Sequence, residues 1–173
     1  MAILNKKNLT IFANSVYIET REVEQTIEFG RLIGSLLKTG DVVALIGQLG
    51  AGKTHFTKGI AEGQGVENRK VVTSPSYVIV KQYMGRLPIY HFDAYRLKSA
   101  DEMYEIDCMG FFWGDGISII EWADKVMECL PDEFIKITIK ILGKTLRGIN
   151  VSYKGERYRD FMEEIKERAK CLK

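Results

Sequence analysis

The sequence predicts an α/β fold, with a central, mostly parallel sheet flanked by helices and with antiparallel hairpins added to it. Three observations support this prediction. The run 42–46 is apolar at every position, as in a strand that is buried on both faces of a parallel sheet. Amphipathic helical patterns lie on both sides of that run. Two later pairs of β-rich segments are joined by short turns that contain glycine, which is typical of hairpins.

Length and composition limit the class of protein. A chain of 173 residues suits one domain over 1–173, with 155–173 as a C-terminal helical tail. Hydrophobic residues make up 46% and charged residues 28%, which is typical of a globular protein. No run approaches the ~18 apolar residues of a membrane-spanning helix, and 1–15 lacks the apolar core of a secretion signal. We expect no membrane partner.

Cysteine content and charge narrow the class further. Three widely spaced cysteines exclude a disulfide framework and a cysteine zinc site, and they suit a reducing compartment, so we expect a cytoplasmic protein. The formal net charge of +2 is small for a dedicated nucleic-acid-binding protein. We expect no DNA partner, and RNA contact only through a local surface or a surface shared with a partner.

The elements follow from periodicity and from stop signals. Over 20–38 the apolar positions recur at spacings of three and four, which predicts a helix with Thr20 as its N-cap and Gly40 as its stop. A second helix is predicted over 53–62. The remaining expectations are hairpins of 77–83 with 87–95 and of 134–142 with 145–153, a buried strand over 117–121, and helices over 100–109 and 156–170.

The segment 47–54 carries the most specific signal in the chain. It reads Gly-Gln-Leu-Gly-Ala-Gly-Lys-Thr and matches the pattern G-x-x-x-x-G-K-[ST]. Glycine permits the backbone conformations in which N–H groups surround a phosphate. Lys53 would place a charge near the β and γ phosphates, and the Thr54 hydroxyl can ligate Mg²⁺. The plainer alternative is a glycine-rich turn, but a buried strand before the loop and a helix after it favour ATP or ADP binding and a P-loop NTPase-like fold.

The strand 117–121 ends in Glu121, whose carboxylate would lie beside this loop. There it could ligate Mg²⁺ directly or through water. The alternative is an acidic residue at an ordinary strand end. We favour the metal role.

The segment 91–96 is a second polar cluster. In an extended chain His91, Asp93 and Tyr95 share one face, because side chains alternate along a strand. Asp93 is the candidate for activating water, whereas a structural network is the more probable role for His91 and Tyr95. The loop 73–77 could sense a γ phosphate, although its residues alone favour the plainer interpretation, a turn that enters a strand.

Taken in order, these segments resemble the TsaE (YjeE) family, the P-loop ATPases that assist bacterial synthesis of threonylcarbamoyladenosine in tRNA. The resemblance covers most of the chain and fades after about residue 155. It rests on the first helix around 24–30, Gly47–Thr54, the Ser-Pro-Ser-Tyr loop, the His-x-Asp-x-Tyr-Arg segment, Ile120-Glu121-Trp122 and Leu130-Pro131. The chain departs from the family pattern at several positions, among them Gln48, His55, Ser76 and Ala94.

The resemblance implies roles for individual residues. Thr54 and Glu121 would hold Mg²⁺, and Asp93, Lys53 and Glu121 would serve hydrolysis. Trp122 would be either a partner-sensitive aromatic or a packed side chain. The nucleotide-contacting positions would be Thr26, Gly47, Gly50, Ala51, Gly52, Lys53, Thr54 and His55.

The function implied is that of an ATP-hydrolysing accessory protein for TsaD and TsaB, which install the modification on an adenosine next to the tRNA anticodon. Contact with tRNA would be indirect or shared. Turnover by the isolated chain would be slow, because the sequence identifies no catalytic arginine. Arg96 is one candidate, and a partner could supply the arginine instead. Two alternatives stay open: a small-molecule P-loop kinase, and a nucleotide-gated binding module with negligible turnover.

Overall fold

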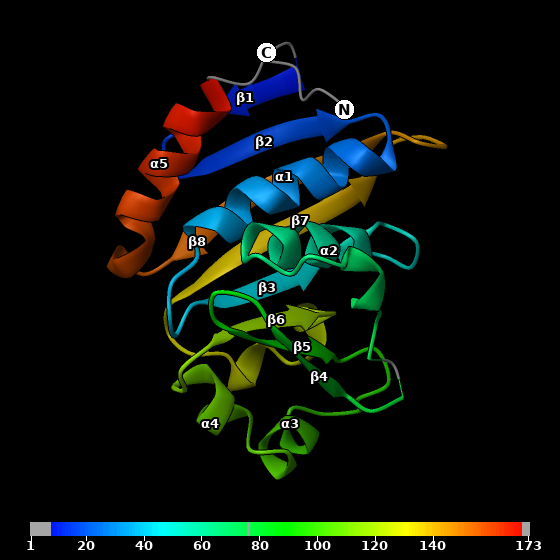
Figure 1. The fold of residues 1–173 in the computed structure, drawn as a ribbon, viewed down its shortest axis with the longest axis vertical. Helices are drawn as coiled ribbons and strands as arrows, with labels where there is room; N and C mark the ends of the chain where they lie inside the picture. Colours follow the sequence, from blue (N-terminus) through cyan, green and yellow to red (C-terminus); the bar gives the residue numbers. More distant parts are fainter. Residues whose placement is uncertain (1–7, 76, 171–173) are drawn as a thin grey trace.

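A computed structural model describes residues 8–75 and 77–170, which form one mixed eight-stranded sheet with helices on both faces (Figure 1). The strand order is β1-β2-β8-β7-β3-β6-β5-β4. The strands are β1 (Leu9–Ile11), β2 (Ser15–Thr20), β3 (Val42–Ile46), β4 (Val80–Met84), β5 (Pro88–Asp93), β6 (Ile117–Glu121), β7 (Phe134–Ile141) and β8 (Arg147–Lys154). The helices are α1 (Val23–Leu36), α2 (Lys53–Gly63), α3 (Asp101–Glu105), α4 (Cys108–Phe112) and α5 (Arg159–Lys170), with short 3₁₀ turns η2 (Arg69–Val71), η3 (Ala123–Lys125), η4 (Met127–Cys129) and η5 (Glu156–Tyr158).

The sheet corrects the prediction that it is mostly parallel. Its centre, β7-β3-β6-β5, is parallel throughout, as the apolar run 42–46 predicted. Outside that centre, β4 pairs antiparallel with β5, β8 with β7, β2 with β8 and β1 with β2. Four antiparallel pairings therefore stand against three parallel ones. The short parallel core is therefore extended on one side by β4 and on the other side by β8, β2 and β1.

The first helix begins later than predicted. Thr20 is not its N-cap but the last residue of β2, where its side chain is buried and its hydroxyl lies 2.8 Å from that of Thr26. Residue Glu22 occupies the N-cap position of α1 and makes no side-chain cap. The helix ends at Leu36 and not at Gly40. The alternating pattern of 15–20 belongs to a half-buried strand, and that strand includes Thr20, which the prediction assigned to the N-cap of the helix.

Two other predicted elements are shorter than expected. The strand predicted over 77–83 begins only at Val80, because Ile79 has a positive φ of 64° and 77–79 belong to a turn. The helix predicted over 100–109 is two short helices, because Asp107 takes a left-handed conformation between α3 and α4. The strand 117–121, the helix of 53–62, both hairpins and the C-terminal helix are confirmed.

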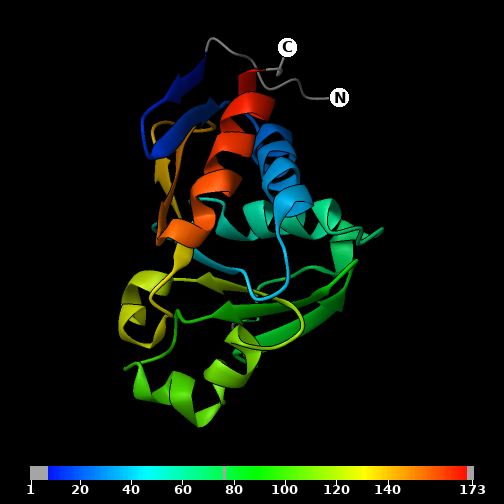
Figure 2. The same cartoon turned by 90° about the vertical axis from the view of Figure 1, so that its left-hand side faces the viewer.

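Helices lie on both faces of the sheet (Figure 2), and each face has its own apolar core. On one face, α1, α2 and α5 pack on alternate residues of the strands, with Phe29, Phe56 and Met162 buried among them. On the other face, α3, α4 and the 3₁₀ turns after β6 enclose a second cluster around Phe92 and Phe112. Because β3 and β6 contribute to both clusters, their residues are buried on both sides.

Helices α1 and α2 pack backbone against backbone. Gly30 and Gly34 of α1 face Gly59 and Gly63 of α2, and a Cβ on any of the four would lie within 2.5 Å of a carbonyl oxygen of the other helix. Only glycine permits such a close approach. The packing fixes the start of α1 relative to the start of α2, and the predicted phosphate loop leads into α2.

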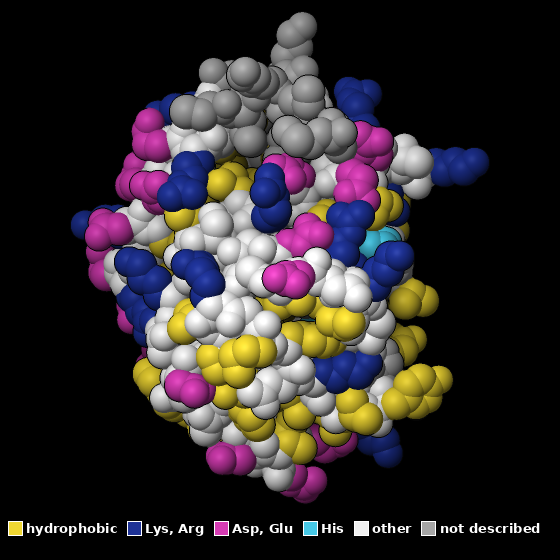
Figure 3. All heavy atoms as spheres, viewed as in Figure 1, with side chains coloured by type: hydrophobic (Ala, Val, Ile, Leu, Met, Phe, Trp, Pro, Cys, Tyr) yellow, Lys and Arg dark blue, Asp and Glu magenta, His cyan; other side chains and the backbone are white. Residues whose placement is uncertain are grey.

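The surface differs between the two halves of the molecule. In the view of Figure 3, charged side chains of both signs dominate the upper part, whereas apolar side chains gather over the lower part. The segment of α3 and α4 contributes exposed Tyr104, Met109 and Trp113. Within 8–75 and 77–170, no helix has the length and apolar character needed to cross a membrane.

Candidate functional site

The glycine-rich loop 47–52 connects the buried strand β3 to helix α2, which is the setting that the motif requires. Gly50 and Gly52 have positive φ values of 75° and 105°, which residues with a Cβ rarely adopt. Gly47 is required for a different reason, because a Cβ there would lie 2.6 Å from the Ile139 carbonyl oxygen of β7. The loop is therefore shaped by its glycines and held against the neighbouring strand.

Lys53, the first residue of α2, folds back over the loop. Its ammonium group donates to the carbonyl oxygens of Gly47 (2.6 Å) and Gln48 (3.2 Å), and it lies 3.6 Å from the centre of the Trp122 ring. Burial lowers the pKa of Lys53, and the nearby carboxylates of Glu121 and Asp93 oppose this effect. A phosphate beside the ammonium would favour the charged form further.

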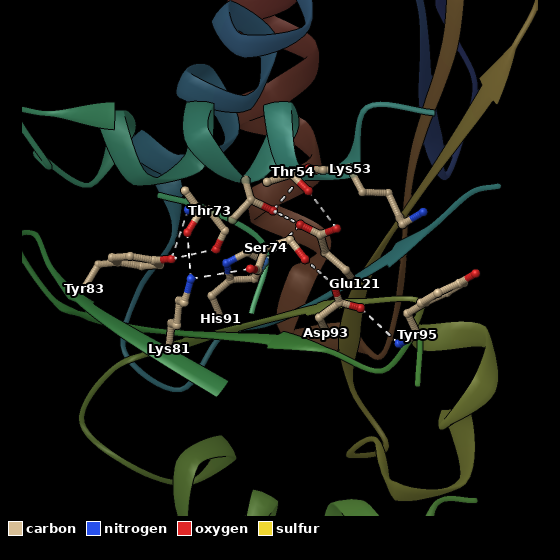
Figure 4. A network of polar contacts seen from close by, with 11 residues as sticks. Lys53, Thr54, Thr73, Ser74, Lys81, Tyr83, His91, Asp93, Tyr95 and Glu121 are labelled. Carbon is tan, nitrogen blue, oxygen red and sulfur yellow. Dashed lines mark hydrogen bonds and ion pairs between the residues drawn. The ribbon is translucent and has the colours of Figure 1, made fainter. Parts of the chain in front are cut away.

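Glu121 is the centre of a buried network (Figure 4). Its Oε2 accepts from the Thr54 hydroxyl at 3.0 Å, and its Oε1 accepts from the Thr57 hydroxyl at 3.4 Å and from His91 Nε2 at 2.9 Å. The donors come from α2 on one side and β5 on the other. The carboxylate is thus fixed beside the first turn of α2, as the prediction for the end of β6 required.

His91 is a structural partner of Glu121 here. Its side chain is fully buried, and its Nδ1 has no hydrogen-bond partner among the described residues. Leaving one nitrogen unpaired costs free energy, so the bond from Nε2 to Glu121 is the contact that places this ring. Tyr95, the third residue of the predicted row, lies beyond the end of β5, with its ring 4.9 Å from that of Trp122.

Asp93 ends β5, directly beside Glu121 in the pairing with β6. Its Oδ1 accepts from the backbone N–H of Tyr95 at 2.9 Å, and its Oδ2 accepts from the Ser74 hydroxyl. The Asp93 carboxylate thus contacts both the loop 73–77 and the backbone that follows β5. Asp93 is also 5% exposed, so it lies at the inner wall of the site.

The loop 73–77 is held to the site from behind by strand β4. The Tyr83 hydroxyl donates to the Thr73 carbonyl oxygen at 3.0 Å, and Lys81 Nζ donates to the Thr73 hydroxyl at 2.6 Å (Figure 4). Through Ser74, the same loop contacts Asp93. Ser76 lies outside the described residues. The predicted γ-phosphate sensor is therefore in contact with the predicted water-activating residue.

These residues surround one open cavity of about 480 Å³. Its lining includes Lys53, Thr54, Asp93 and Glu121, together with Ser74, Tyr77, Tyr95, Arg96 and Trp122. Arg96 lies over the exposed ring of Tyr77, with 4.4 Å from its Cζ to the ring centre. The residues predicted for metal binding and for hydrolysis thus come together in space.

Thr26 and His55 lie on the other side of the loop, in a second cavity of about 340 Å³ that also borders Gly50, Ala51 and Gly52. His55 borders both cavities. Burial lowers the pKa of His55, and the charge of Lys58 lowers it further. Thr26 is buried against Thr20, and it lines this second cavity together with residues of the loop.

Two further residues at the site were missed by sequence reasoning. Thr57 contacts Glu121, and Arg147 donates to two carbonyl oxygens of the loop. Trp122, which the resemblance implied would be either a partner-sensitive aromatic or a packed side chain, packs under Lys53 in a left-handed conformation with φ of 61°. Thr57 lies one helical turn after Lys53, so helical spacing could have found it. Nothing in the local sequence of Arg147 indicates a contact with a loop about 97 residues earlier.

The side chains at the site that could ligate a metal suit a magnesium ion and do not suit a zinc ion. Within the described part of the chain, no three His, Cys, Asp or Glu side chains are grouped so that they could hold a metal. Mg²⁺ needs fewer protein ligands, because it keeps several waters and binds one or two carboxylates together with phosphate oxygens. The adjacent hydroxyl of Thr54 and carboxylate of Glu121 meet that requirement.

The parallel core, the glycine-rich loop between β3 and α2, and the carboxylate of Glu121 beside that loop define an α/β protein of the P-loop class. The model of the family "Threonylcarbamoyl adenosine biosynthesis protein TsaE" matches residues 20–149. The chain belongs to the TsaE family, whose members take part in the biosynthesis of threonylcarbamoyladenosine in tRNA.

Relatives and a solved structure agree with this assignment. The chain is 42% identical to the TsaE protein of Bacillus subtilis over 143 residues, which cover 82% of this chain and 88% of the relative. It is 38% identical to the TsaE protein of Treponema pallidum over 133 residues, 77% of this chain and 97% of the relative. The crystal structure of YdiB from Bacillus subtilis superposes with a TM-score of 0.74 at 36% identity, covering 92% of this chain and 99% of YdiB.

Proposed function

We propose that this protein binds and hydrolyses ATP, and that it thereby supports TsaD and TsaB in forming threonylcarbamoyladenosine in tRNA next to the anticodon. The proposal rests above all on one observation: Lys53, Thr54, Asp93 and Glu121 line a single cavity at a phosphate-type loop. Membership of the TsaE family supports the place in tRNA modification. The cytoplasm, where tRNA is modified, is the compartment that we infer.

The chain's own residues divide the chemistry among them. Backbone N–H groups of the loop and the Lys53 ammonium would bind the phosphates and stabilise the charge that develops as the γ phosphate leaves. Thr54 and Glu121 would hold Mg²⁺, which supplies further positive charge at the phosphates. Asp93 would orient the attacking water. Ser74, which contacts Asp93, would report the state of the γ phosphate to the loop 73–77.

We expect Asp93→Asn to separate hydrolysis from binding. The amide cannot accept a proton from water, so turnover should fall by about a hundredfold or more. Because Asp93 lies beyond the loop, ADP affinity should change less than about threefold. Calorimetric titration with ADP and steady-state phosphate release measure the two effects. Asp115→Asn, a surface acid that accepts from Tyr90, is the control that should leave both unchanged. Unaltered turnover in Asp93→Asn would remove Asp93 from the mechanism.

The partner proposal has a separate test. Stimulated phosphoryl-transfer enzymes commonly receive a catalytic arginine from a partner, with a gain of about 10³-fold or more. Arg96, the candidate in this chain, is packed over Tyr77, so we expect slow turnover by the protein alone. A saturating mixture of TsaD and TsaB should raise phosphate release by at least about tenfold. Turnover that stays the same in that mixture would contradict an accessory role for this ATPase.

Two further measurements, of phosphate transfer to an acceptor and of complex assembly, separate the alternatives. A small-molecule kinase would transfer the γ phosphate to an added nucleoside or small acid, and phosphate release alone would then be a side reaction. A nucleotide-gated module would assemble with TsaD and TsaB in an ATP-dependent manner and would still do so in Asp93→Asn. The buried magnesium-type site favours hydrolysis over gating, because binding alone does not require Asp93 beside Glu121.

A further inference from the structure

The hairpin β7–β8 contacts the phosphate loop at both ends of the loop, although sequence analysis assigned the hairpin no role at the site. At the start of the loop, the carbonyl oxygen of Ile139 in β7 lies where a Cβ of Gly47 would be. At the far end, Arg147, the first residue of β8, reaches the peptide groups of Gly50 and Ala51. The loop therefore lies against the hairpin along its length.

The guanidinium of Arg147 makes an unusual set of contacts: each of its hydrogen bonds to the described residues is donated to a backbone carbonyl oxygen. Nε donates to Ala51 O at 3.0 Å, and Nη2 donates to Gly50 O at 3.2 Å. Nη1 donates to Gly143 O at 3.1 Å and to Leu146 O at 3.0 Å, which are in the hairpin turn. One edge of the rigid fork is thus fixed to the turn, and the other edge contacts two successive peptide groups of the loop.

These contacts determine which way the loop's N–H groups point. In a planar trans peptide the C=O and the following N–H point in opposite directions, and no cis peptide occurs in the described chain. Arg147 holds the Ala51 carbonyl toward the hairpin. The N–H of Gly52 therefore points away from the hairpin, and Gly52 itself lines the cavity that is also lined by Lys53 and Thr54. Gly50 and Gly52, with their positive φ values, have other conformations open to them if that hold is lost.

We propose that Arg147 is a positioning residue for phosphate binding: it orients the peptide groups of Gly50–Gly52 before the ligand arrives, and so lowers the cost of ordering the loop. The inference rests on the proposed function, because it assumes that the loop binds phosphates. Arg147 acts through the loop and needs no contact with the ligand. A loop held in this way is preorganised, and preorganisation raises affinity without adding a contact.

The test uses the full chain, inorganic pyrophosphate and ADP. Arg147→Ala should weaken the binding of both probes by about tenfold, the loss expected when one well-placed charged hydrogen-bond donor is removed. Arg147→Lys keeps the positive charge but not the planar fork, so it should recover only part of that loss. Lys136→Ala, on the exposed face of the same hairpin, removes a charge without touching the loop and should bind like the unaltered protein.

A second measurement reports on the loop itself. In the unaltered protein, pyrophosphate should shift the backbone amide resonance of Gly52, and in Arg147→Ala this resonance should broaden before ligand is added. If Arg147→Lys bound both probes as tightly as the unaltered protein, the positive charge and not the planar geometry of the guanidinium would account for the affinity, and the proposal would be overturned. Unchanged affinity in Arg147→Ala would overturn it as well. Failure of the unaltered protein to bind either probe would instead overturn the proposed function.

Discussion

Replacing Lys53 with Ala should abolish the stabilisation of this protein by ADP and ATP. A ligand at a hundred times its Kd stabilises the native state by about 2.7 kcal/mol. For a chain of this size that corresponds to a rise in Tm of roughly 5–10 °C. The Lys53 ammonium group lies over the loop, where it donates to the carbonyl oxygens of Gly47 and Gln48. Without it, phosphate charge at the loop loses its principal counter-charge.

The measurement is thermal unfolding of each variant with and without saturating nucleotide, so that each variant is compared with its own ligand-free state. This comparison matters because Lys53→Ala also removes the contact with Trp122 and can change the starting Tm. Lys58→Ala is the matched control: it removes the same charge from the same helix but contacts neither the loop nor Glu121 in the described structure. A nucleotide-dependent rise in Tm that survives in Lys53→Ala would exclude the loop as the binding site.

The central part of the fold could be predicted from the sequence because it depends on local patterns. The apolar run 42–46 and the strand 117–121 are buried on both faces, and each was assigned correctly. The N-terminal strands were not predicted. β1 has only three residues and is mostly exposed, and β2 places Val16 and Ile18 in the core only because β8, more than 120 residues later, pairs with it. Such pairing depends on tertiary contacts, which no local pattern contains.

At the candidate site, too, local patterns predicted some residues, whereas residues that depend on tertiary contacts were missed. Lys53, Thr54 and Glu121 were predicted because the loop motif and a strand that ends in an acid are local signals, and the structure brings them together. Arg147 was missed because its contacts are with backbone carbonyls, which every residue possesses and no motif records. Side chains that act on the backbone of a distant loop are recognised only when the topology is known.

The contact between α1 and α2 should be the most sensitive packing site in the molecule. Gly59→Ala would place a Cβ 2.1 Å from the Ile27 carbonyl oxygen and 2.9 Å from Arg31 N. These are backbone atoms of a neighbouring helix, so no flexible side chain can move aside. Overpacking of this kind typically costs about 1–3 kcal/mol and in some cases more. Alanine regains about 1 kcal/mol of helix propensity. Because the contacted atoms are backbone, we expect the overpacking cost to lie at the upper end of its range, which leaves a net loss of about 2 kcal/mol.

Urea unfolding measures the loss, with Gly143→Ala as the control. A Cβ at Gly143 meets only the Leu146 Cβ at 3.5 Å, which is ordinary contact, so its effect should stay within about 0.5 kcal/mol. Gly34→Ala, whose Cβ would lie 2.2 Å from the Ile60 carbonyl oxygen, should reproduce the effect from the other helix. If the free energy of unfolding of Gly59→Ala lies within about 1 kcal/mol of that of the unaltered protein, the two helices can move apart with little loss of stability. The close approach would then not fix Thr26 of α1 relative to the loop that opens α2. If the loss is as large as expected, the four glycines are needed because they allow the close approach that holds α1 and α2 together beside the loop.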